Sequence, residues 1–553
     1  MNLIKTFIAV ILLVIVLDGR SQVVYEHVSN KNIYEFIDEL ANQKIIELNS
    51  VVKPYSRKYI ADKLLEAKKS VAQMSNREKK ELDFYLNAFK AEIDSLPDYP
   101  RKINIFKKTD NLSLAWNPLG LFYKDKLFTF SLGVIWGIEY FYNENKGMYH
   151  SWGGLKAEAY IGKHWGFYAN LRDNTETIKI SDPEYFTQRG GGGNYKGSSS
   201  GGVDYEEMRG GIVYSWKWGS FGLIKDHINW GNNYHGPNIF NDRPPSIPQL
   251  ALRMKPAKWF ELNYFHGWLV SMVVDSNASY YYMKDNALQY RETYRPKYMA
   301  ANMMTFTPWK RLNISLGNSI VYSDMNVQPA YLIPFLFYKA VDHMINSGID
   351  NQNSQMFFDV SSRQIKHLHL YGTFFIDEFK KSRIYTSEEH NFWSMKLGAK
   401  ESDLVAKNLS VTFEYTMTMP ITYQHYVPTL TFASNYFNFG NYLRDNSREF
   451  YVAAEYKPVR GLHILAAYTL AQHGDDFNYA EPDPTFTPYM QNITWQKNEV
   501  SIGARWEFIS NSYIYLRYIY SDITGNEEQV KKYTPVYFRG EHNTLSVGFN
   551  LGF

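Results

Sequence analysis

Residues 155–174, "LKAEAYIGKHWGFYANLRDN", decide the fold class of this chain. Apolar side chains occupy every second position from Leu155 to Ile161, and again from Trp165 to Leu171 after a turn at Gly162. A period of two is typical of β-strands that separate two environments. If the apolar positions face lipid, a polar interior is lined by Lys156, Glu158, Asn170 and Arg172. The stretch therefore predicts one hairpin of a transmembrane β-barrel.

The same alternation closes the sequence. Residues 545–553 read "LSVGFNLGF", with apolar side chains at every odd position. This pattern predicts a last barrel strand with a lipid-facing side. Its end, with Phe549, Leu551 and Phe553, resembles the signal by which the barrel-assembly machinery recognises its substrates, so we expect that machinery as a partner during biogenesis.

Composition fits a barrel and excludes other classes. The chain has 553 residues, 17% of them aromatic, and a mean hydropathy of −0.40. No internal apolar run reaches the ~18 to 20 residues that a membrane-spanning helix needs. A barrel keeps a low mean hydropathy because only alternate residues face lipid. The net charge of +3 gives no basis for nucleic-acid binding, and the lack of cysteine excludes disulfides, thiolate-bound metals and a lipoprotein anchor.

Three segments are expected along the chain. Residues 1–22 read as a signal peptide, because the apolar run from Phe7 to Leu17 is short for a membrane span. Residues 23–110 are expected to form a periplasmic bundle of three amphipathic helices with a linker, and to expose their charged faces to solvent. Ser75 and Glu78 are spaced as a capping box at the start of the third helix.

Residues 111–553 are expected to form an all-β, antiparallel outer-membrane barrel of about eighteen strands. The count starts at about residues 126–142, and "NLSLAWNP" before them is a possible additional strand. Short turns with Pro and a basic residue alternate with long polar connections, which predicts short turns on one rim and long extracellular loops on the other. A secreted β-sandwich or propeller is the alternative, but it gives no reason for one-sided loops.

The sequence shows no catalytic constellation with convincing spacing, so we expect no enzyme, no cofactor and no metal. His367 and His369 share one face of a strand, which could present two imidazoles to a metal, but lumen-facing histidines are the simpler interpretation. Asp377 and Glu378 are adjacent on a strand and do not read as a glycosidase pair.

The long connections are rich in aromatic and amide side chains. Residues 228–249, "INWGNNYHGPNIFNDRPPSIPQ", contain groups that suit stacking and hydrogen bonding to sugars, namely Trp230, Asn232, Asn233, Tyr234 and Arg243. The alternative is that these aromatics belong to the interfacial girdle and that the loop packs over the barrel. A short helix is predicted over residues 335–345, where it would cap the external mouth or fold into it.

The chain resembles the capsule-assembly Wzi family, and within it the Bacteroidetes branch that includes the gliding-motility protein RemB. The shared segments are the helical opening "IYEFIDELANQ", the W-G segment at 230–231, "IPFLFYKAVDHM" followed by "LHLYGTFFIDEF", and "YQHYVPTLTFASNYFNFGNYLRD". The chain departs from the family after "KYMAA" and "ISLG", where Asn302 and Asn318 stand.

The resemblance implies an occluded eighteen-stranded barrel that tethers capsular polysaccharide or exopolysaccharide at the cell surface, as a lectin does, without catalysis. It also implies polar contacts at the mouth from Lys339, Asp342, Asp377 and Glu378. Two alternatives stay open. One is an interaction protein of gliding motility or secretion, whose periplasmic helices dock a protein partner. The other, less expected, is a diffusion porin or nutrient transporter.

Overall fold

The computed structural model describes residues 22–94, 97–100, 102–105, 111–197, 201–345, 348–349, 351–385, 389–403, 405–479 and 484–552. The predicted signal peptide, apart from Gln22, and the last residue, Phe553, lie outside the described residues.

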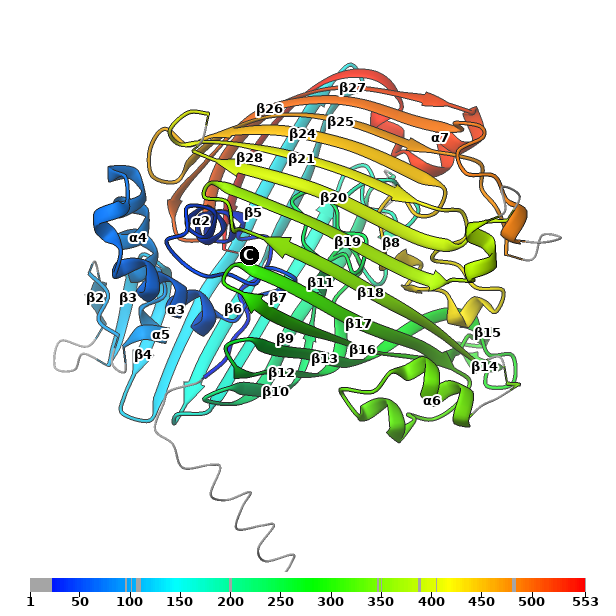
Figure 1. The fold of residues 1–553 in the computed structure, drawn as a ribbon, viewed down its shortest axis with the longest axis horizontal. Coiled ribbons are helices and arrows are strands. Elements are labelled where there is room, and N and C mark those ends of the chain that lie inside the picture. Colours follow the sequence, from blue (N-terminus) through cyan, green and yellow to red (C-terminus); the bar gives the residue numbers. More distant parts are fainter. Residues whose placement is uncertain are drawn as a thin grey trace, which may run out of the picture.

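Eighteen antiparallel strands form a closed barrel, as predicted (Figure 1). The last strand closes the barrel by pairing with the first, with Leu545 opposite Tyr142 and Leu551 opposite Trp136. In order around the wall the strands are β5 (Phe128–Asn143), β6 (Lys146–Ile161), β7 (Trp165–Glu176), β9 (Val203–Trp216), β10 (Gly219–Asp226), β12 (Ile247–Ala257), β13 (Phe260–Val274), β16 (Tyr294–Trp309), β17 (Leu312–Ser323), β18 (Gln352–Ser362), β19 (Leu368–Glu378), β20 (Phe392–Ser402), β21 (Leu409–Thr418), β24 (Ser447–Tyr456), β25 (Leu462–His473), β26 (Trp495–Ile509), β27 (Ser512–Gly525) and β28 (Gly540–Leu551).

Three further strands extend the sheet beside β5. β28 pairs only with the second half of β5, and the first half, Thr129–Leu132, pairs with β4 (Leu119–Lys124). β4 continues to β3 (Leu112–Trp116) and β3 to β2 (Lys102–Asn104). The segment "NLSLAWNP" is therefore a strand, but it lies beside the closed wall.

Side chains alternate along the wall strands between an outer apolar face and an inner polar face. Leu155 and Leu171 of the first quoted hairpin are half exposed on the outside, as are Leu516, Leu545 and Val547 near the end of the chain. The inward positions are polar and largely covered. This two-sided pattern is that of a barrel wall in a bilayer, where only the outward residues meet lipid.

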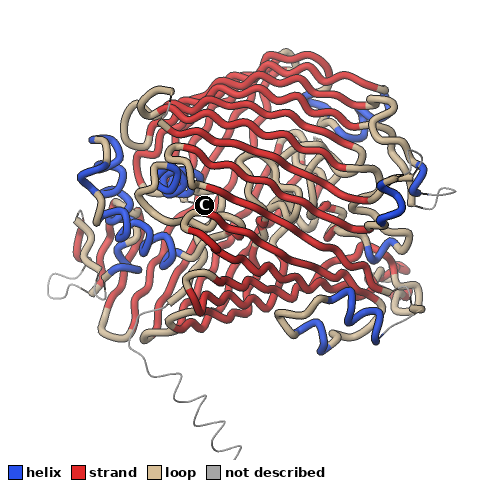
Figure 2. The backbone as a smooth tube through the Cα atoms, in the orientation of Figure 1, coloured by secondary structure: helices blue, strands red, loops and turns tan. Residues whose placement is uncertain are grey.

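The two rims of the barrel differ in loop length. Strands meet in short turns at 162–164, 217–218, 258–259, 310–311 and 510–511, here called the short-turn end. At the opposite, long-loop end all connections except 144–145 are long (Figure 2). The predicted difference in loop length between the two rims is therefore present. In outer-membrane barrels as a class, the short turns face the periplasm and the long loops face outward. The small elements of the long loops are β8 (Lys196–Gly197), β11 (Asn229–Trp230), β14 (Tyr280–Lys284), β15 (Ala287–Arg291), β22 (Ala433–Ser434), β23 (Phe437–Asn438), α6 (Tyr338–Ile345), α7 (Glu527–Tyr533) and the 3-10 turns Pro329–Leu332, Lys381–Ile384, Pro428–Leu430, Pro484–Phe486 and Val536–Phe538.

The predicted N-terminal helices lie at the short-turn end (Figure 1). They are α2 (Lys31–Asn42), α3 (Arg57–Lys68), α4 (Asn76–Ala88) and α5 (Lys90–Ile93), with a 3-10 turn at Val71–Gln73 and a two-residue strand β1 (Val52–Lys53). Ser75 and Glu78 form the predicted capping box of α4. The apolar faces of helices α2, α3 and α4 share a core that contains Phe36, Leu64 and Leu82. Among the residues described, no helix is both long enough and apolar enough to cross a bilayer.

The loop helix α6 differs from its predicted place. It forms within the predicted range, but it neither caps the mouth nor enters the lumen. It lies outside the wall strands (Figure 1). There Tyr338 is buried in a cluster with Tyr264 and Tyr322. The physical reason is an outward polar pair, Asn302 and Asn318, which bonds to the backbone next to the helix.

Candidate functional site

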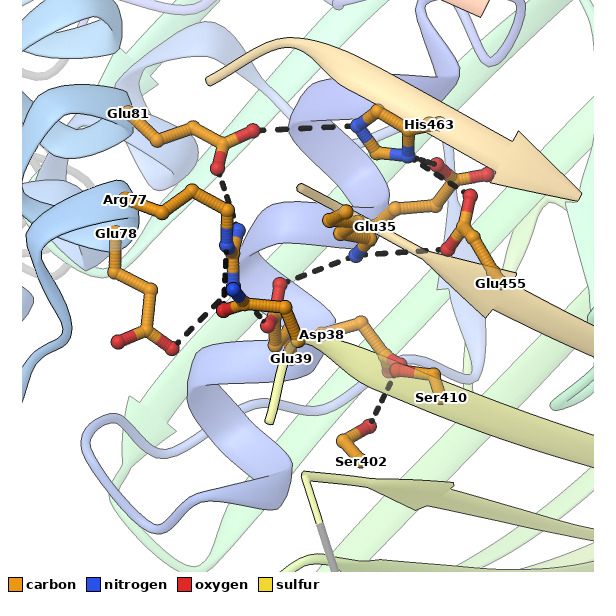
Figure 3. A network of polar contacts seen from close by, with 12 residues as sticks. Glu35, Asp38, Glu39, Arg77, Glu78, Glu81, Ser402, Ser410, Glu455 and His463 are labelled. Atoms are coloured by element: carbon orange, nitrogen blue, oxygen red, sulfur yellow. Dashed lines mark hydrogen bonds and ion pairs between the residues drawn. The ribbon is translucent and has the colours of Figure 1, made fainter. Parts of the chain in front are cut away.

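Helix α2 lies inside the barrel and makes ion pairs with the inner wall. The Glu35 carboxylate lies 2.7 Å from the Arg505 guanidinium of β26 and 3.2 Å from His463 of β25. Glu39, one turn later, lies 3.1 Å from the ammonium of Lys457. Figure 3 shows these α2 carboxylates between the barrel strands and Arg77 of α4, which also pairs with Glu39. The helix is therefore held by ion pairs to the inner wall.

Arg363, at the end of β18, makes the densest set of these contacts. Its guanidinium donates to Asp38 at 2.6 Å, to the Asn42 side chain at 2.8 Å and to the Ser50 hydroxyl at 3.1 Å. Arg363 is buried, so these charge-assisted bonds form away from water, where they are strong. One side chain thus ties α2 and the following loop to the barrel.

The expectation that the charged helix faces are solvated is wrong for α2. Glu39 is 1% exposed and Asp38 is 7% exposed. Burial raises the pKa of the Asp38 carboxyl, but Arg363 and Lys400 outweigh burial and hold this pKa well below its usual range. Asp38 and Arg363 stand 325 residues apart in the chain, so no local pattern could reveal the pair.

One carboxyl, Asp403 in the turn after β20, lies close to other carboxyls. Asp403 accepts a hydrogen bond from the Gln43 amide at 2.6 Å and lies near Glu39 and Glu78. Burial and the negative charge of Glu39 raise the pKa of Asp403 to about 6. Because the raised pKa belongs to the folded state, Asp403 favours folding while it is protonated, and this contribution is lost as the pH rises through about 6.

We therefore expect Asp403→Asn to raise the melting temperature in detergent at pH 8, and to change it less at pH 4.5. Asparagine keeps a side-chain acceptor and tolerates the positive φ of 64° at this position. The control is Asp83→Asn, an exposed carboxylate on α4, which should leave the difference between the two pH values unchanged. A melting temperature that falls at pH 8 would contradict the assignment.

The loop after β10, residues 227–246, folds into the barrel and meets the N-terminal segment. Trp230 pairs with Val52 in a short antiparallel ladder between β11 and β1. The Asn232 side chain donates to Asp359 of β18 at 2.6 Å and accepts from Ser50 at 2.5 Å. We call residues 227–246 the inward loop, since both its backbone and its side chains bond to groups inside the lumen.

An aromatic core lies inside the barrel where these segments meet. Phe240 of the inward loop is buried against Trp230, Phe265 of β13 and Phe357 of β18, with ring centroids 5.3 to 5.5 Å apart. The loop between β21 and β24 adds rings from its own side, including Phe432 and Phe439. The lumen of this barrel thus holds a packed hydrophobic core made from three separate parts of the chain.

Five of the sugar-binding candidates lie in the inward loop. Trp230 is 4% exposed, so its ring faces are covered by neighbouring side chains. Tyr234 donates its hydroxyl to Asp38 at 2.7 Å, and Arg243 donates to the backbone of Asp182 at 2.6 Å. Asn232 and Asn233 also bond within the chain. Sugar contact by these residues stays a prediction, and their observed role is to hold the lumen core together.

The other candidates are not brought together with them. Lys339 and Asp342 lie on α6 at the outer wall. Asp377 is buried and accepts from the Gln355 amide at 3.2 Å, whereas Glu378, one residue later, pairs with Arg383 at 2.9 Å. The candidate set is thus divided between the outer wall, the long-loop rim and the lumen.

The polar residues of the first hairpin lie on the inner face. Glu158 lies 3.5 Å from Arg57 of α3, and the Arg172 guanidinium lies over the Trp152 ring, 4.6 Å from its centroid. Asn170 lies opposite Lys156 across the β6–β7 ladder. Phe549 of the last strand packs against Trp136, and Leu551 is the last residue of β28.

Within the described residues, three groups of carboxylates and histidines have donor atoms within 4.8 Å of one another. They are His27, Glu207 and His227; Glu35, Glu455 and His463; and Glu39, Glu78 and Asp403. In the first group the two imidazoles bond to each other at 3.2 Å and His227 to Glu207 at 3.1 Å. In the second group Glu35 pairs with Arg505, and in the third Glu39 pairs with Lys457 and Arg77. The absence of a metal stays a prediction for these groups.

Sequence reasoning missed an exposed hairpin at the long-loop end. Strands β14 and β15 pair from Tyr280 opposite Arg291 to Lys284 opposite Ala287, and every residue in them is exposed. Tyr281 and Tyr290 stand side by side on one face, with ring centroids 4.8 Å apart. The density of tyrosine in "SYYYMKDNALQYRETY" was the available signal. Uncovered rings of this kind are free to stack on a ligand.

Comparisons with known proteins agree with the fold. No protein-family model and no curated protein matches the chain. Among solved structures it is similar to Wzi of Escherichia coli, described as a carbohydrate-binding β-barrel involved in group 1 capsule assembly, with a TM-score of 0.57 and 10% identity over 96% of this chain and 99% of that one. OccD3 of Pseudomonas aeruginosa and OccAB2 of Acinetobacter baumannii each cover 76% of this chain, with a TM-score of 0.41 and 11% identity, over 90% and 97% of their own lengths. The chain is thus a closed barrel with the fold of outer-membrane proteins.

Proposed function

We propose that this barrel binds polysaccharide at the cell surface and catalyses no reaction. The observation that carries the proposal is the β14–β15 hairpin, which presents uncovered tyrosine rings beyond the rim. Flat rings stack on the C–H faces of sugars, and Arg291 and Lys284 on the other face of the hairpin suit acidic sugars. The filled lumen supports the same reading, because a barrel that is closed inside acts through its surface. The described fold of Wzi, a carbohydrate-binding barrel, agrees with it.

The test is the affinity of the purified barrel for capsular polysaccharide or exopolysaccharide of the producing cell. We expect Tyr281→Ala with Tyr290→Ala to weaken binding about tenfold or more, since truncating a tyrosine that is a binding hot spot costs about 2 kcal/mol or more. Tyr385→Ala removes an exposed tyrosine from a different loop and is the matched control. Unchanged binding in the double variant would show that the binding site does not include the hairpin. No binding by the intact barrel would contradict the proposed function.

The second candidate is an interaction protein of gliding motility or secretion, as in the RemB branch. The α3 and α4 helices could dock a periplasmic protein, and their exposed residues are polar or charged, among them Asp62, Lys68 and Lys80. A deletion strain separates the two candidates. Loss of surface polysaccharide staining with normal motility supports the first, and the reverse supports the second.

A further inference from the structure

One part of the barrel wall is covered from outside. On β17, Leu316 is half exposed, as expected for a lipid-facing side chain, but Ile320 and Tyr322 on the same outer face are 0% exposed. Tyr264 of β13 and Ala300 of β16 beside them are also buried. The cover is residues 324–345, here called the wall loop, whose Tyr331 and Tyr338 pack on these four side chains.

The wall loop is clasped by a polar pair on the outer face. The Asn318 amide donates to the Asn302 side-chain oxygen at 2.8 Å, and the Asn302 amide donates to the Leu336 carbonyl at 2.9 Å. The Tyr338 N–H donates to the Asn318 side-chain oxygen at 3.0 Å. Amides that face lipid without partners are strongly unfavourable, so this pair fits the outer face only with the wall loop in place.

Other bonds pair some of the backbone groups in the non-helical part of the wall loop. The Tyr264 hydroxyl donates to the Tyr331 carbonyl at 2.9 Å, and the Tyr338 hydroxyl donates to the Ile333 carbonyl at 3.3 Å. Irregular backbone is tolerated at membrane depth where protein groups satisfy it. These bonds lower the free-energy cost of placing this part of the wall loop against acyl chains.

Between Leu332 and Ile345 the exposed side chains of the wall loop are apolar, with the exception of His343. Phe335 is 63% exposed and Met344 is 85% exposed, and Ile333, Phe337 and Ile345 are also uncovered. Exposed apolar patches of this kind mark a contact with another apolar body. The patch continues into the lipid-facing wall, because Leu316 and its partner Phe358 on β18 lie one outward position beyond Asn318 and are themselves exposed.

We propose that the wall loop is a membrane-embedded element that binds the acyl chains of the outer leaflet through Phe335, Phe337 and Met344. The continuity with the lipid-facing wall favours acyl chains over a second copy of the chain, and the apolar chemistry of the exposed surface disfavours water. The clasp by Asn302 and Asn318 holds the loop against the wall at this level. This inference is independent of the glycan proposal.

The experiment uses the full chain, whose natural lack of cysteine makes single labels clean. Phe335→Cys and Met344→Cys receive a spin label, and the protein is reconstituted into phospholipid vesicles. Power saturation is compared for oxygen, which partitions into lipid, and for a water-soluble nickel chelate. Val547→Cys in the wall is the lipid reference, and Leu288→Cys in the exposed hairpin is the water reference.

We expect oxygen to give the larger shift at residues 335 and 344, as at the Val547 reference, with the reverse order at the Leu288 reference. Nickel dominance at both wall-loop positions would overturn the proposal, and so would protection from both reagents, which would indicate a second protein copy. In Asn302→Ala/Asn318→Ala, the label at 344 should lose its oxygen preference. If that variant does not fold, the single-label comparison still decides.

Discussion

Arg363→Ala should release helix α2 from the barrel. The substitution leaves Asp38 buried without its closest counter-charge, 2.6 Å away, and removes the bonds to Asn42 and Ser50. Deleting one partner of a buried ion pair costs about 3–5 kcal/mol, which exceeds what a single local contact can replace. The barrel wall itself should persist, since its strands are held by their own ladders.

The measurement uses Ala41→Cys as a reporter, because Ala41 is buried in the helical core and the chain has no other cysteine. We expect the rate of maleimide labelling in detergent to rise on the order of 100-fold or more with Arg363→Ala, because exposure of the thiol requires local opening of α2.

The matched control is Arg311→Ala, since this arginine also reaches the N-terminal segment from a short turn. Among the residues that the structure describes, its guanidinium donates to one acceptor, the Lys44 carbonyl at 2.9 Å, and a single neutral acceptor contributes about 1 kcal/mol. Its labelling rate should therefore rise by roughly tenfold or less. Equal labelling rates in the two variants would show that Arg363 does not hold α2 more strongly than Arg311 does.

The barrel and the helices could be predicted from the sequence because each rests on neighbours in the chain. Leu155 and Leu171 mark the lipid face by parity alone, and the capping box of Ser75 and Glu78 spans four residues. Patterns of this kind involve only residues that are close in sequence, so they can be recognised without knowing the rest of the fold.

The filling of the lumen could not be predicted in this way. The pairs that hold it, such as Asp38 with Arg363 and Asn232 with Asp359, join residues that are distant in sequence. An acidic helix face looks the same in solvent and inside a charged barrel. Trp230 equally suits a sugar platform or a packed core, and only the fold decides that its rings are covered.

The α6 helix illustrates a third case. The helix could be predicted from its own sequence, but its position depends on side chains of the barrel wall that bond to it. Asn302 and Asn318 face each other across β16 and β17 on the lipid side, which neither strand reveals alone. The position of α6 on the barrel is set by a pair of residues on neighbouring strands, and a single sequence does not show which residues of two strands are paired.

The intact protein should not conduct ions. A barrel of this strand number is wide enough for an aqueous channel when it is empty. Here the space holds α2 with its ion pairs and, beyond it, the core around Phe240, to which the N-terminal segment contributes Val51 and Val52. Single-channel recording in a planar bilayer should therefore show no steps for the full chain.

Removing residues 23–94 should make the barrel conduct. The deletion takes away α2, the β1 partner of Trp230 and the Ser50 bond to Asn232, so the inward loop loses its support on one side. Removing the exposed hairpin, residues 276–292, is the control, since its strands stand outside the lumen core and the protein should stay closed. Steps from the full chain would contradict a sealed lumen and revive the porin alternative. Silence from a heat-modifiable, truncated barrel would instead mean that the inward loop with its aromatic core seals the lumen without the N-terminal segment.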